Sequence, residues 1–305
     1  MRCGIVGPGA LGTFLSGMIG RKNQVVLSGH KDLSIDEVEI KGKTELRTKI
    51  TYTTQVENLS DVEYILICTK SFQTERAMKE MHEYISPDTM LVSLQNGLKN
   101  EKVISRFVGE DRVIGGITEE GITFERHGKV IHAGEGKTVI GPYSDDIPDK
   151  FREKIKRFSG CLNEVGISNR ISDNIYGHIW KKVIINAGIN PVTAITGLKN
   201  GAIIKHNNLM KLLENICEEA EKVAKNEVKI PGESSTIEAK NVAKMTADNK
   251  SSMLQDIENQ RRTEIDCING AIVSVADRYG IEVPFNRAMV YLVKGLEDSY
   301  LHRSD

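Results

Sequence analysis

The sequence has no excess of either charge, since 41 Lys and Arg residues are balanced by 42 Asp and Glu residues. Nucleic acids and anionic membrane surfaces are held by basic patches, so the composition argues against both as partners. The sequence also has no apolar run near the ~18–20 residues of a membrane-spanning helix. Its apolar first 20 residues carry glycines in a strand–turn–helix pattern, which is not the pattern of a signal peptide.

Cysteine is scarce and scattered. The five cysteines lie mostly in apolar runs, with no CxxC pair and no His/Cys cluster at the spacing of metal ligands. Their odd number argues against a disulfide framework, and their scatter argues against a zinc site. We therefore expect reduced, buried thiols in a cytoplasmic protein that holds no metal.

The length of 305 residues favours two domains. Short apolar strands alternate with helices up to about residue 171, and the remainder is predicted helical at 173–196, 207–226, 235–246, 252–279 and 287–300. We predict an α/β domain with a doubly wound sheet over 1–171 and an all-α domain over 172–305. The apolar helices of the second domain could form a homodimer interface or only the core of that domain.

A glycine-rich turn follows the first predicted strand (residues 3–6) and precedes a predicted helix. Its six residues are Gly7, Pro8, Gly9, Ala10, Leu11 and Gly12. In the GxGxxG pattern the first glycine makes the tight turn, the second admits a pyrophosphate, and the third lets helix pack on strand. A glycine-rich turn can be only a turn, but this strand–turn–helix context favours a dinucleotide.

The second predicted strand, 24–28, ends in Ser28-Gly29-His30-Lys31. A site for NAD usually has an acidic residue here, to hold the ribose 2′-hydroxyl. The acid is missing and Lys31 supplies a cation, which favours the 2′-phosphate of NADP. NAD stays the alternative, because Asp32 lies one residue beyond.

Two further strands end in polar residues. Lys70 follows the strand at 64–68, and Asn96 follows the strand at 90–94. Ligands of doubly wound sheets bind at the carboxyl ends of the strands, which predicts that both residues lie near the cofactor. Lys70 could equally be a solvated surface lysine, and Asn-Gly is a turn signal by itself.

One apolar stretch of the second domain carries three polar residues at helical spacing. Lys182, Asn186 and Asn190 recur at i, i+4 and i+8, so they form one line on a helix whose other residues are suited to burial. Buried amide and ammonium groups need partners, because each unpaired group costs about 1–3 kcal/mol. The line indicates either an internal polar network or the site of a small polar ligand on which Lys182 acts.

A long helix is predicted over 252–279. Ser252 and Gln255 have the spacing of a capping box at its start, which would suit a carboxylate but is also an ordinary helix cap. Glu264 lies further along, roughly 18 Å from Ser252 on an ideal helix and about 120° away in phase. The two can contact the same ligand only if the helix bends or the ligand complex is extended.

Together these motifs resemble those of the ketopantoate reductase (2-dehydropantoate 2-reductase) family. The matching residues are Gly7 to Gly12, Thr69-Lys70, Gln95-Asn96-Gly97, Trp180-Lys181-Lys182 through Asn186 to Asn190-Pro191, Asn200-Gly201, Ser251-Ser252-Met253-Leu254-Gln255-Asp256 and Thr263-Glu264-Ile265-Asp266. The resemblance implies a Rossmann-type domain followed by a helical domain like the C-terminal domain of 6-phosphogluconate dehydrogenase. It implies reduction of ketopantoate to (R)-pantoate by NADPH, on the route to pantothenate and coenzyme A.

The resemblance also implies roles for these residues. Lys182 would be the general acid, and Glu264 would hold the substrate hydroxyl or line the cofactor side. The substrate's polar ends would be held by Asn186, Asn190, Asn200 and Ser252. Asn96 would contact cofactor and substrate, and the cofactor phosphates would lie on the glycine-rich turn, Lys31 and Lys70.

Two alternatives remain open. One is a reductase of another 2-oxo acid with the same two domains. The other is a module that senses NADPH without turning it over, which would be expected to lack Lys182 and the two asparagines. Because all three are present, catalysis is the favoured interpretation.

Overall fold

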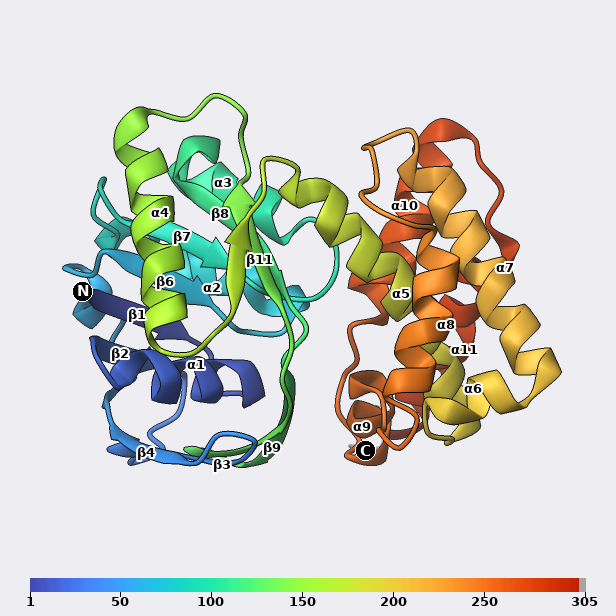
Figure 1. Cartoon of the computed structure of the whole chain (residues 1–305), viewed down its shortest axis with the longest axis horizontal. Coiled ribbons are helices and arrows are strands. Elements are labelled where there is room, and N and C mark those ends of the chain that lie inside the picture. The colour runs from blue at the N-terminus through green and yellow to red at the C-terminus, as the bar shows by residue number, and fades with distance from the viewer. Residues whose placement is uncertain (302–305) are drawn as a thin grey trace. The chain divides into compact units, whose positions relative to one another are not determined.

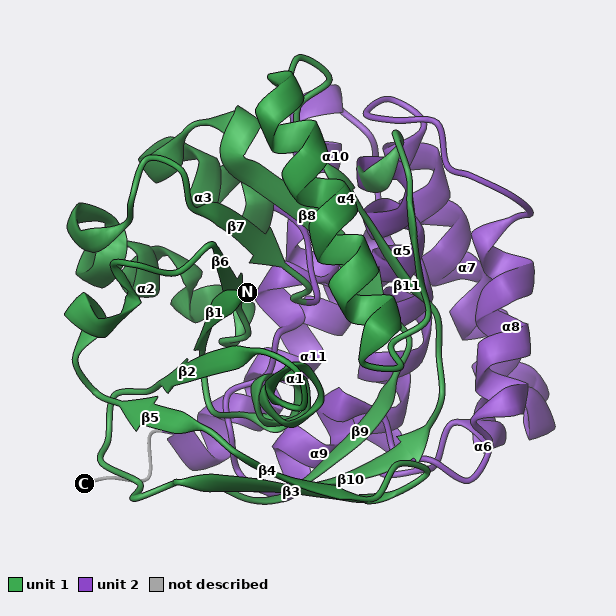
Figure 2. Cartoon of the chain, turned by 60° about the vertical axis from the view of Figure 1, so that its left-hand side comes forward, with its two compact units in different colours: residues 1–95, 100–175 green, residues 96–99, 176–305 purple. Residues whose placement is uncertain are grey.

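The computed structural model describes residues 1–301, which form two units (Figure 1, Figure 2). The first unit comprises Met1–Gln95 and Asn100–Ile175, and the second comprises Asn96–Lys99 and the chain from Tyr176 onward. The strands lie in the first unit, whereas the second is helical. This architecture confirms the predicted α/β domain followed by an all-α domain.

The first unit is built on an eight-stranded sheet of order β12-β11-β8-β7-β6-β1-β2-β5. Its strands are β1 (Arg2–Val6), β2 (Gln24–Ser28), β5 (Thr51–Thr53), β6 (Tyr64–Ile67), β7 (Met90–Ser93), β8 (Val113–Thr118), β11 (Thr138–Pro142) and β12 (Asn169–Ile171). All neighbours are parallel except β8 and β11. The strand order reverses between β1 and β6, which makes the ends of these strands the expected ligand site.

A smaller sheet of order β4-β3-β10-β9 lies against α1. Its strands are β3 (Glu37–Gly42), β4 (Leu46–Lys49), β9 (Gly121–Arg126) and β10 (Lys129–Gly134). Figure 2 shows α1 between the two sheets. The chain between residues 37 and 53 forms three strands, of which β5 joins the large sheet because it pairs with β2.

Helices cover both faces of the large sheet, as a doubly wound fold requires. They are α1 (Ala10–Gly20), α2 (Thr74–Met81), α3 (Asn100–Val108) and α4 (Asp149–Glu164), with 3₁₀ turns η1 (Val56–Leu59), η2 (Ser71–Gln73), η3 (His82–Tyr84) and η4 (Glu110–Arg112). Leu66 packs with Phe14 of α1 and Phe158 of α4, whereas its neighbour Ile65 packs with Met78 of α2. Successive strand residues point to opposite faces, so a continuous apolar strand serves both cores.

The second unit consists of seven helices and one 3₁₀ turn among its described residues. They are α5 (Ile175–Thr196), α6 (Gly201–Lys205), α7 (Asn207–Ala224), α8 (Ser235–Met245), α9 (Ser252–Glu258), η5 (Ile265–Cys267), α10 (Asn269–Tyr279) and α11 (Pro284–Leu301). The interior of α5 is strongly buried, with Trp180, Ile184 and Ala187 fully enclosed.

The predicted long helix over 252–279 is wrong. Helix α9 ends at Glu258, and Gln260 adopts a left-handed conformation with φ of 52°. The chain then turns back, because the Arg261 N–H donates to the Asp256 carbonyl at 2.8 Å, and resumes as α10 at Asn269. The Thr263 N–H is bonded at 2.5 Å to the buried Glu297 carboxylate of α11. Because of this break, the distance and phase calculated for Ser252 and Glu264 on one ideal helix do not apply.

The predicted capping box at Ser252 is also wrong by one residue. The N-cap of α9 is Ser251, whose Oγ accepts the Leu254 N–H at 3.1 Å. Ser252 is the first helical residue, and its side chain is exposed.

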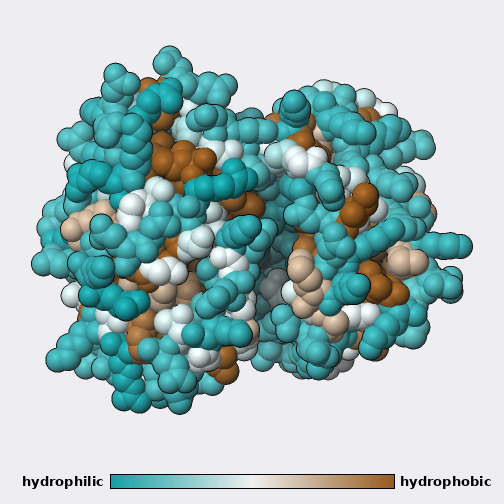
Figure 3. Space-filling view, in the orientation of Figure 1, coloured by the Kyte–Doolittle hydropathy of each residue, from teal (hydrophilic) through white to brown (hydrophobic). Residues whose placement is uncertain are grey.

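Within residues 1–301, no helix is both long and apolar enough to cross a membrane. The face shown in Figure 3 is mostly hydrophilic, with hydrophobic residues in small groups. Met245 and Tyr291 of the second unit are the most exposed of the large hydrophobic side chains in the described chain.

Candidate active site

The glycine-rich turn joins β1 to α1. Gly7 has φ of 109°, and a Cβ there would lie 2.8 Å from the Thr69 backbone nitrogen. A Cβ on Gly12 would lie 2.0 Å from the Gly7 carbonyl oxygen, whereas a Cβ on Gly9 would meet no atom within 4 Å. Gly7 and Gly12 are therefore required by packing, and the backbone at Gly9 borders open space.

The start of α1 suits an anion. Gly9 is its N-cap and offers no side-chain cap, and no acidic residue lies in the first turn. The first N–H groups of a helix lack partners within the helix and lie at its positive end. This terminus and the open backbone at Gly9 fit a phosphate-bearing ligand.

Lys31 lies beyond the end of β2, beside this turn. The Tyr52 hydroxyl donates to the Lys31 carbonyl and so holds the backbone there. The backbone at Gly29 packs closely against Pro8, since a Cβ on Gly29 would lie 3.0 Å from the Pro8 side chain. The Lys31 side chain is exposed. Asp32 is engaged locally, since its carboxylate accepts the Ser34 N–H at 3.1 Å. Lys31 thus offers an exposed cation at the strand end, which fits a 2′-phosphate, although the exposed carboxylate of Asp32 lies one residue beyond it.

Lys70 follows β6, at the start of η2. Its side chain is half-buried, and its carbonyl accepts the Gln73 N–H at 2.8 Å. The preceding residue, Thr69, is the one whose backbone lies against Gly7. The fold thus brings the Thr69–Lys70 turn and the glycine-rich turn together.

In the second unit, α5 carries the predicted polar line as one continuous helix. Lys182 and Asn186 are half-buried, and Asn190 is buried. Within residues 1–301, the side-chain amides of Asn186 and Asn190 form no hydrogen bond. These two amides therefore take no part in an internal network of the described chain, and both stay available to a ligand.

Pro191 lies inside α5 without breaking it. A proline at this position removes the N–H that would bond the Ala187 carbonyl. The Asn269 side chain at the start of α10 donates to that carbonyl at 3.3 Å. Asn269 therefore compensates the helix at the point between Asn186 and Asn190.

The loop before α6 and the start of α9 lie beside the end of α5. The Asn200 N–H donates to the Asn249 carbonyl at 3.0 Å, and its Nδ2 donates to Thr246 Oγ1 at 2.9 Å. The Asn200 Oδ1 atom is buried and has no partner within the described chain. Thr193 Oγ1 donates to Ser251 Oγ at 2.7 Å. These bonds bring the segments bearing Asn190, Asn200 and Ser252 together.

Glu264 and Asn96 form a second group. Asn96 Nδ2 donates to Glu264 Oε2 at 3.4 Å, and Glu264 is buried. The loop after Asn96 is docked by its backbone, since the Leu98 N–H donates to the Cys267 carbonyl at 3.0 Å. Gly97 has φ of 89°, and a Cβ there would lie 2.7 Å from the Cys267 carbonyl oxygen.

The two adjacent lysines of α5 differ in their surroundings. The Lys181 ammonium forms an ion pair with Glu238 and donates to the Pro231 carbonyl at 3.1 Å. Lys181 is thus engaged in holding the loop before α8. The helical phase that selects Lys182 as the partner of Asn186 is consistent with this division.

Two supporting residues, Thr193 and Asn269, were not singled out from the sequence, and Ser251 was named only within a matching stretch, without a role. Ser251 had a signal, since it is a cap-forming residue directly before the start predicted for the helix. Pro191 was a signal that some group must bond the Ala187 carbonyl, but it could not identify Asn269.

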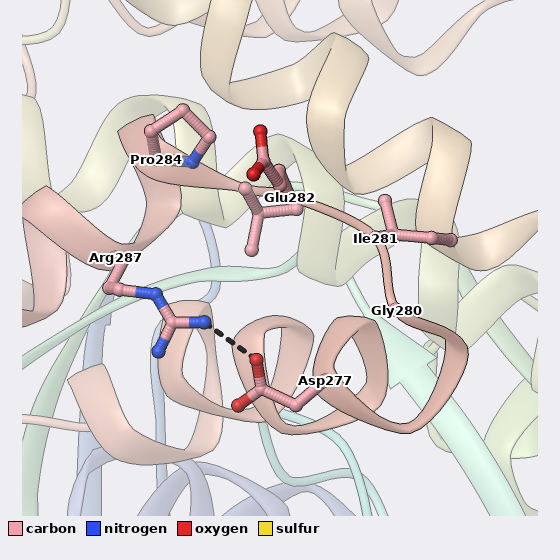
Figure 4. A pocket seen from close by; sticks show the side chains of 7 residues that line it. Asp277, Gly280, Ile281, Glu282, Pro284 and Arg287 are labelled. Atoms are coloured by element: carbon pink, nitrogen blue, oxygen red, sulfur yellow. Dashed lines mark hydrogen bonds and ion pairs between the residues drawn. The ribbon is translucent and has the colours of Figure 1, made fainter.

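A separate pocket lies at the turn from α10 to α11, lined by Asp277, Gly280, Ile281, Glu282, Val283, Pro284 and Arg287. Figure 4 shows Arg287 and Asp277 directed toward each other, with a guanidinium–carboxylate distance of 2.6 Å. No predicted site residue lines this pocket. Within the described chain, no group of three or more His, Cys, Asp or Glu residues could hold a metal ion.

Family models match both parts of the chain. The model described as ketopantoate reductase PanE/ApbA matches residues 3–145, and the one described as ketopantoate reductase PanE/ApbA C terminal matches residues 174–297. Two curated relatives are both named 2-dehydropantoate 2-reductase. The protein from Archaeoglobus fulgidus is 31% identical, and the one from Pyrococcus horikoshii is 33% identical. Each alignment covers 97% of this chain and 98% of the relative.

Solved structures agree along the whole length. A PanE/ApbA family ketopantoate reductase from Ralstonia eutropha JMP134 has a TM-score of 0.88 at 28% identity, covering 99% of this chain and 100% of its own. The ternary structure of D-mandelate dehydrogenase with NADH and anilino(oxo)acetate has a TM-score of 0.89 at 28% identity, covering 99% of both chains.

Proposed function

The chain belongs to the ketopantoate reductase family of oxidoreductases, and we propose that it reduces ketopantoate (2-dehydropantoate) to (R)-pantoate with NADPH. The observation that carries this proposal is the line of Lys182, Asn186 and Asn190 on α5. The amides of both asparagines form no hydrogen bond within residues 1–301, although the helix around them is buried. Both amides are therefore available to bond a small polar substrate.

NADPH, when bound, supplies the hydride for the substrate carbonyl. Gly9 and the first turn of α1 would hold its pyrophosphate, because they offer an open backbone and free N–H groups. Lys31 would hold the 2′-phosphate, and Lys70 a phosphate nearer to the turn.

Lys182 acts as the general acid in this proposal. Negative charge develops on the carbonyl oxygen as the carbonyl carbon is reduced, and an ammonium there stabilises it and donates a proton. Loss of the ammonium proton at alkaline pH would remove the acid, so we expect the rate to fall on the alkaline side.

The other polar side chains bind and orient the substrate. Asn186, Asn190, Asn200 and Ser252 would bond its carboxylate and hydroxyl ends. The unpaired, buried Asn200 Oδ1 requires a donor, which a substrate hydroxyl can supply. Glu264 would accept a bond from a substrate hydroxyl, and Asn96, which is bonded to Glu264, would contact cofactor and substrate.

The experiment is NADPH and NADH oxidation at 340 nm with ketopantoate, on the wild type and on Lys182→Ala. We expect faster oxidation of NADPH than of NADH by the wild type. We expect Lys182→Ala to lose about 10²–10⁴-fold in kcat, the usual contribution of a general acid. The matched control is Lys181→Ala, which removes the neighbouring ammonium and is expected to keep most of the activity.

A wild type that binds NADPH but leaves ketopantoate unreduced would refute the substrate. An active Lys182→Ala, or equal losses in the two alanine variants, would refute the assignment of the acid. A rate that stays constant through pH 10 would contradict it independently.

A second candidate is a reductase of another 2-oxo acid. It is favoured by the similarity to D-mandelate dehydrogenase, which was solved with NADH and an oxoacetate. A panel of 2-oxo acids assayed with both cofactors distinguishes the two, because the preferred substrate has the highest kcat/KM. If the protein reduces none of these acids, the remaining interpretation is a module that senses NADPH without turning it over.

A further inference from the structure

Gln95 lies at the end of β7 and is only 6% exposed. Its Nε2 donates two hydrogen bonds of 2.8 Å, one to the Thr69 carbonyl and one to Thr74 Oγ1. These acceptors lie at the two ends of the segment that carries Lys70 and η2. A single amide therefore fixes both ends of this segment to the end of the neighbouring strand.

The Thr69 backbone also packs against the glycine-rich turn. A Cβ on Gly7 would lie 2.8 Å from the Thr69 nitrogen and 2.9 Å from the Cys68 carbonyl carbon. A shift of Thr69 would consequently change the packing of the backbone at Gly7. Through Thr69, Gln95 is thus linked to the proposed pyrophosphate site without lying at it.

A second buried amide closes the same network. Thr74 Oγ1 donates to Asn100 Oδ1 at 3.2 Å, and Asn100 Nδ2 donates to Ser71 Oγ at 3.2 Å. Gln95 and Asn100 are the residues at which the chain leaves the first unit and re-enters it. Both boundaries of the Asn96–Lys99 loop are therefore held by the segment that carries Lys70.

The other half of the Gln95 amide is unsatisfied. Its Oε1 atom is buried and has no hydrogen-bond partner within the described chain. An apolar side chain of similar length would avoid this unpaired oxygen but would lose both N–H donors. The two hydrogen bonds that Nε2 donates, to the Thr69 carbonyl and to Thr74 Oγ1, therefore account for an amide at this position.

Building on the proposed function, we propose that Gln95 is a positioning residue for the dinucleotide. Its amide holds the Thr69–Lys70 turn against the glycine-rich turn and so sets the affinity for NADPH. It takes no part in proton transfer, which belongs to Lys182.

The test is direct titration of NADPH, followed by the quenching of its fluorescence or by calorimetry, with no substrate present. Gln95→Met keeps the length and removes both donors, and we expect the Kd for NADPH to rise about tenfold, equivalent to ~1.4 kcal/mol. The KM for NADPH should rise in parallel, while kcat at saturating NADPH and the pH profile of kcat stay close to those of the wild type. Should Gln95→Met fail to fold, Thr74→Val removes one acceptor only and should raise the Kd by a smaller factor.

Asn169→Leu is the matched control. Asn169 is a half-buried amide in β12, at the far edge of the same sheet, and its Nδ2 donates to the Ser159 and Ile167 carbonyls. We expect this variant to lose thermal stability without changing the Kd. A Gln95→Met Kd equal to that of the wild type, or an equal rise in Asn169→Leu, would overturn the positioning role. Failure of the proposed reaction is separate, since it would be seen as a wild type that binds NADPH without reducing ketopantoate.

Discussion

Glu101 allows a sharp test of burial in the first unit. It lies in the first turn of α3, is 2% exposed, and its Oε2 atom has no hydrogen-bond partner within the described chain. Burial disfavours the charged carboxylate and raises the pKa of Glu101 from 4.5 to about 7. A group with a raised pKa in the folded state favours folding while protonated. Its contribution is therefore complete below pH 4.5 and is lost as the pH rises through about 7.

Glu101→Gln removes this titration and keeps the shape of the side chain. The difference between a pKa of about 7 and one of 4.5 corresponds to about 3 kcal/mol of stability, lost by the wild type between pH 4 and pH 9. We expect the variant to match the wild type near pH 4.5 and to be the more stable protein at pH 9, by roughly 5–10 °C in Tm.

The assay is thermal unfolding followed by circular dichroism at pH 4.5, 7 and 9, with matched ionic strength. Glu110→Gln serves as the control, because Glu110 is an exposed residue close to the end of the same helix. Parallel pH dependence of Tm in Glu101→Gln and the wild type would show that Glu101 is ionised without cost, which would refute the reasoning.

Three further predictions concern the site. Gly9→Ala should leave Tm unchanged but weaken NADPH binding measured by titration. Gly12→Ala should lower Tm, because its Cβ would lie 2.0 Å from a backbone oxygen. Equal Tm values for the two variants would contradict this prediction. Lys31→Glu should raise the KM for NADPH about tenfold and leave that for NADH nearly unchanged, and a parallel change would remove the 2′-phosphate role. Thr193→Val should cost about 1 kcal/mol in denaturant unfolding through loss of the bond to Ser251, and an unchanged midpoint would disprove it.

Local patterns were sufficient for the architecture. The glycine-rich turn between an apolar strand and a helix predicted the first β–α unit, and the change in periodicity near residue 171 predicted the helical second domain. The spacing of Lys182, Asn186 and Asn190 predicted one helix, which α5 confirms. The roles of these residues stay predictions until the variants are assayed.

Local patterns failed where a distant partner decides the conformation. The helical periodicity over 252–279 continues past Gln260, yet the chain turns there, since the Thr263 N–H is bonded to Glu297 of a later helix. A capping box at Ser252 was predicted, but the cap is Ser251, whose hydroxyl is held by Thr193 of α5.

The sequence by itself determined the α/β and all-α parts, the dinucleotide motif and the polar line of α5. These depend on residue types at fixed short spacings, which local backbone geometry converts directly into strands, turns and helices. Only the tertiary structure decided that Gln95 holds the turn of Lys70, that Asn269 bonds the carbonyl freed by Pro191, and that Glu101 is buried. Such facts depend on which buried polar groups meet across long sequence separations, and no local pattern specifies those partners.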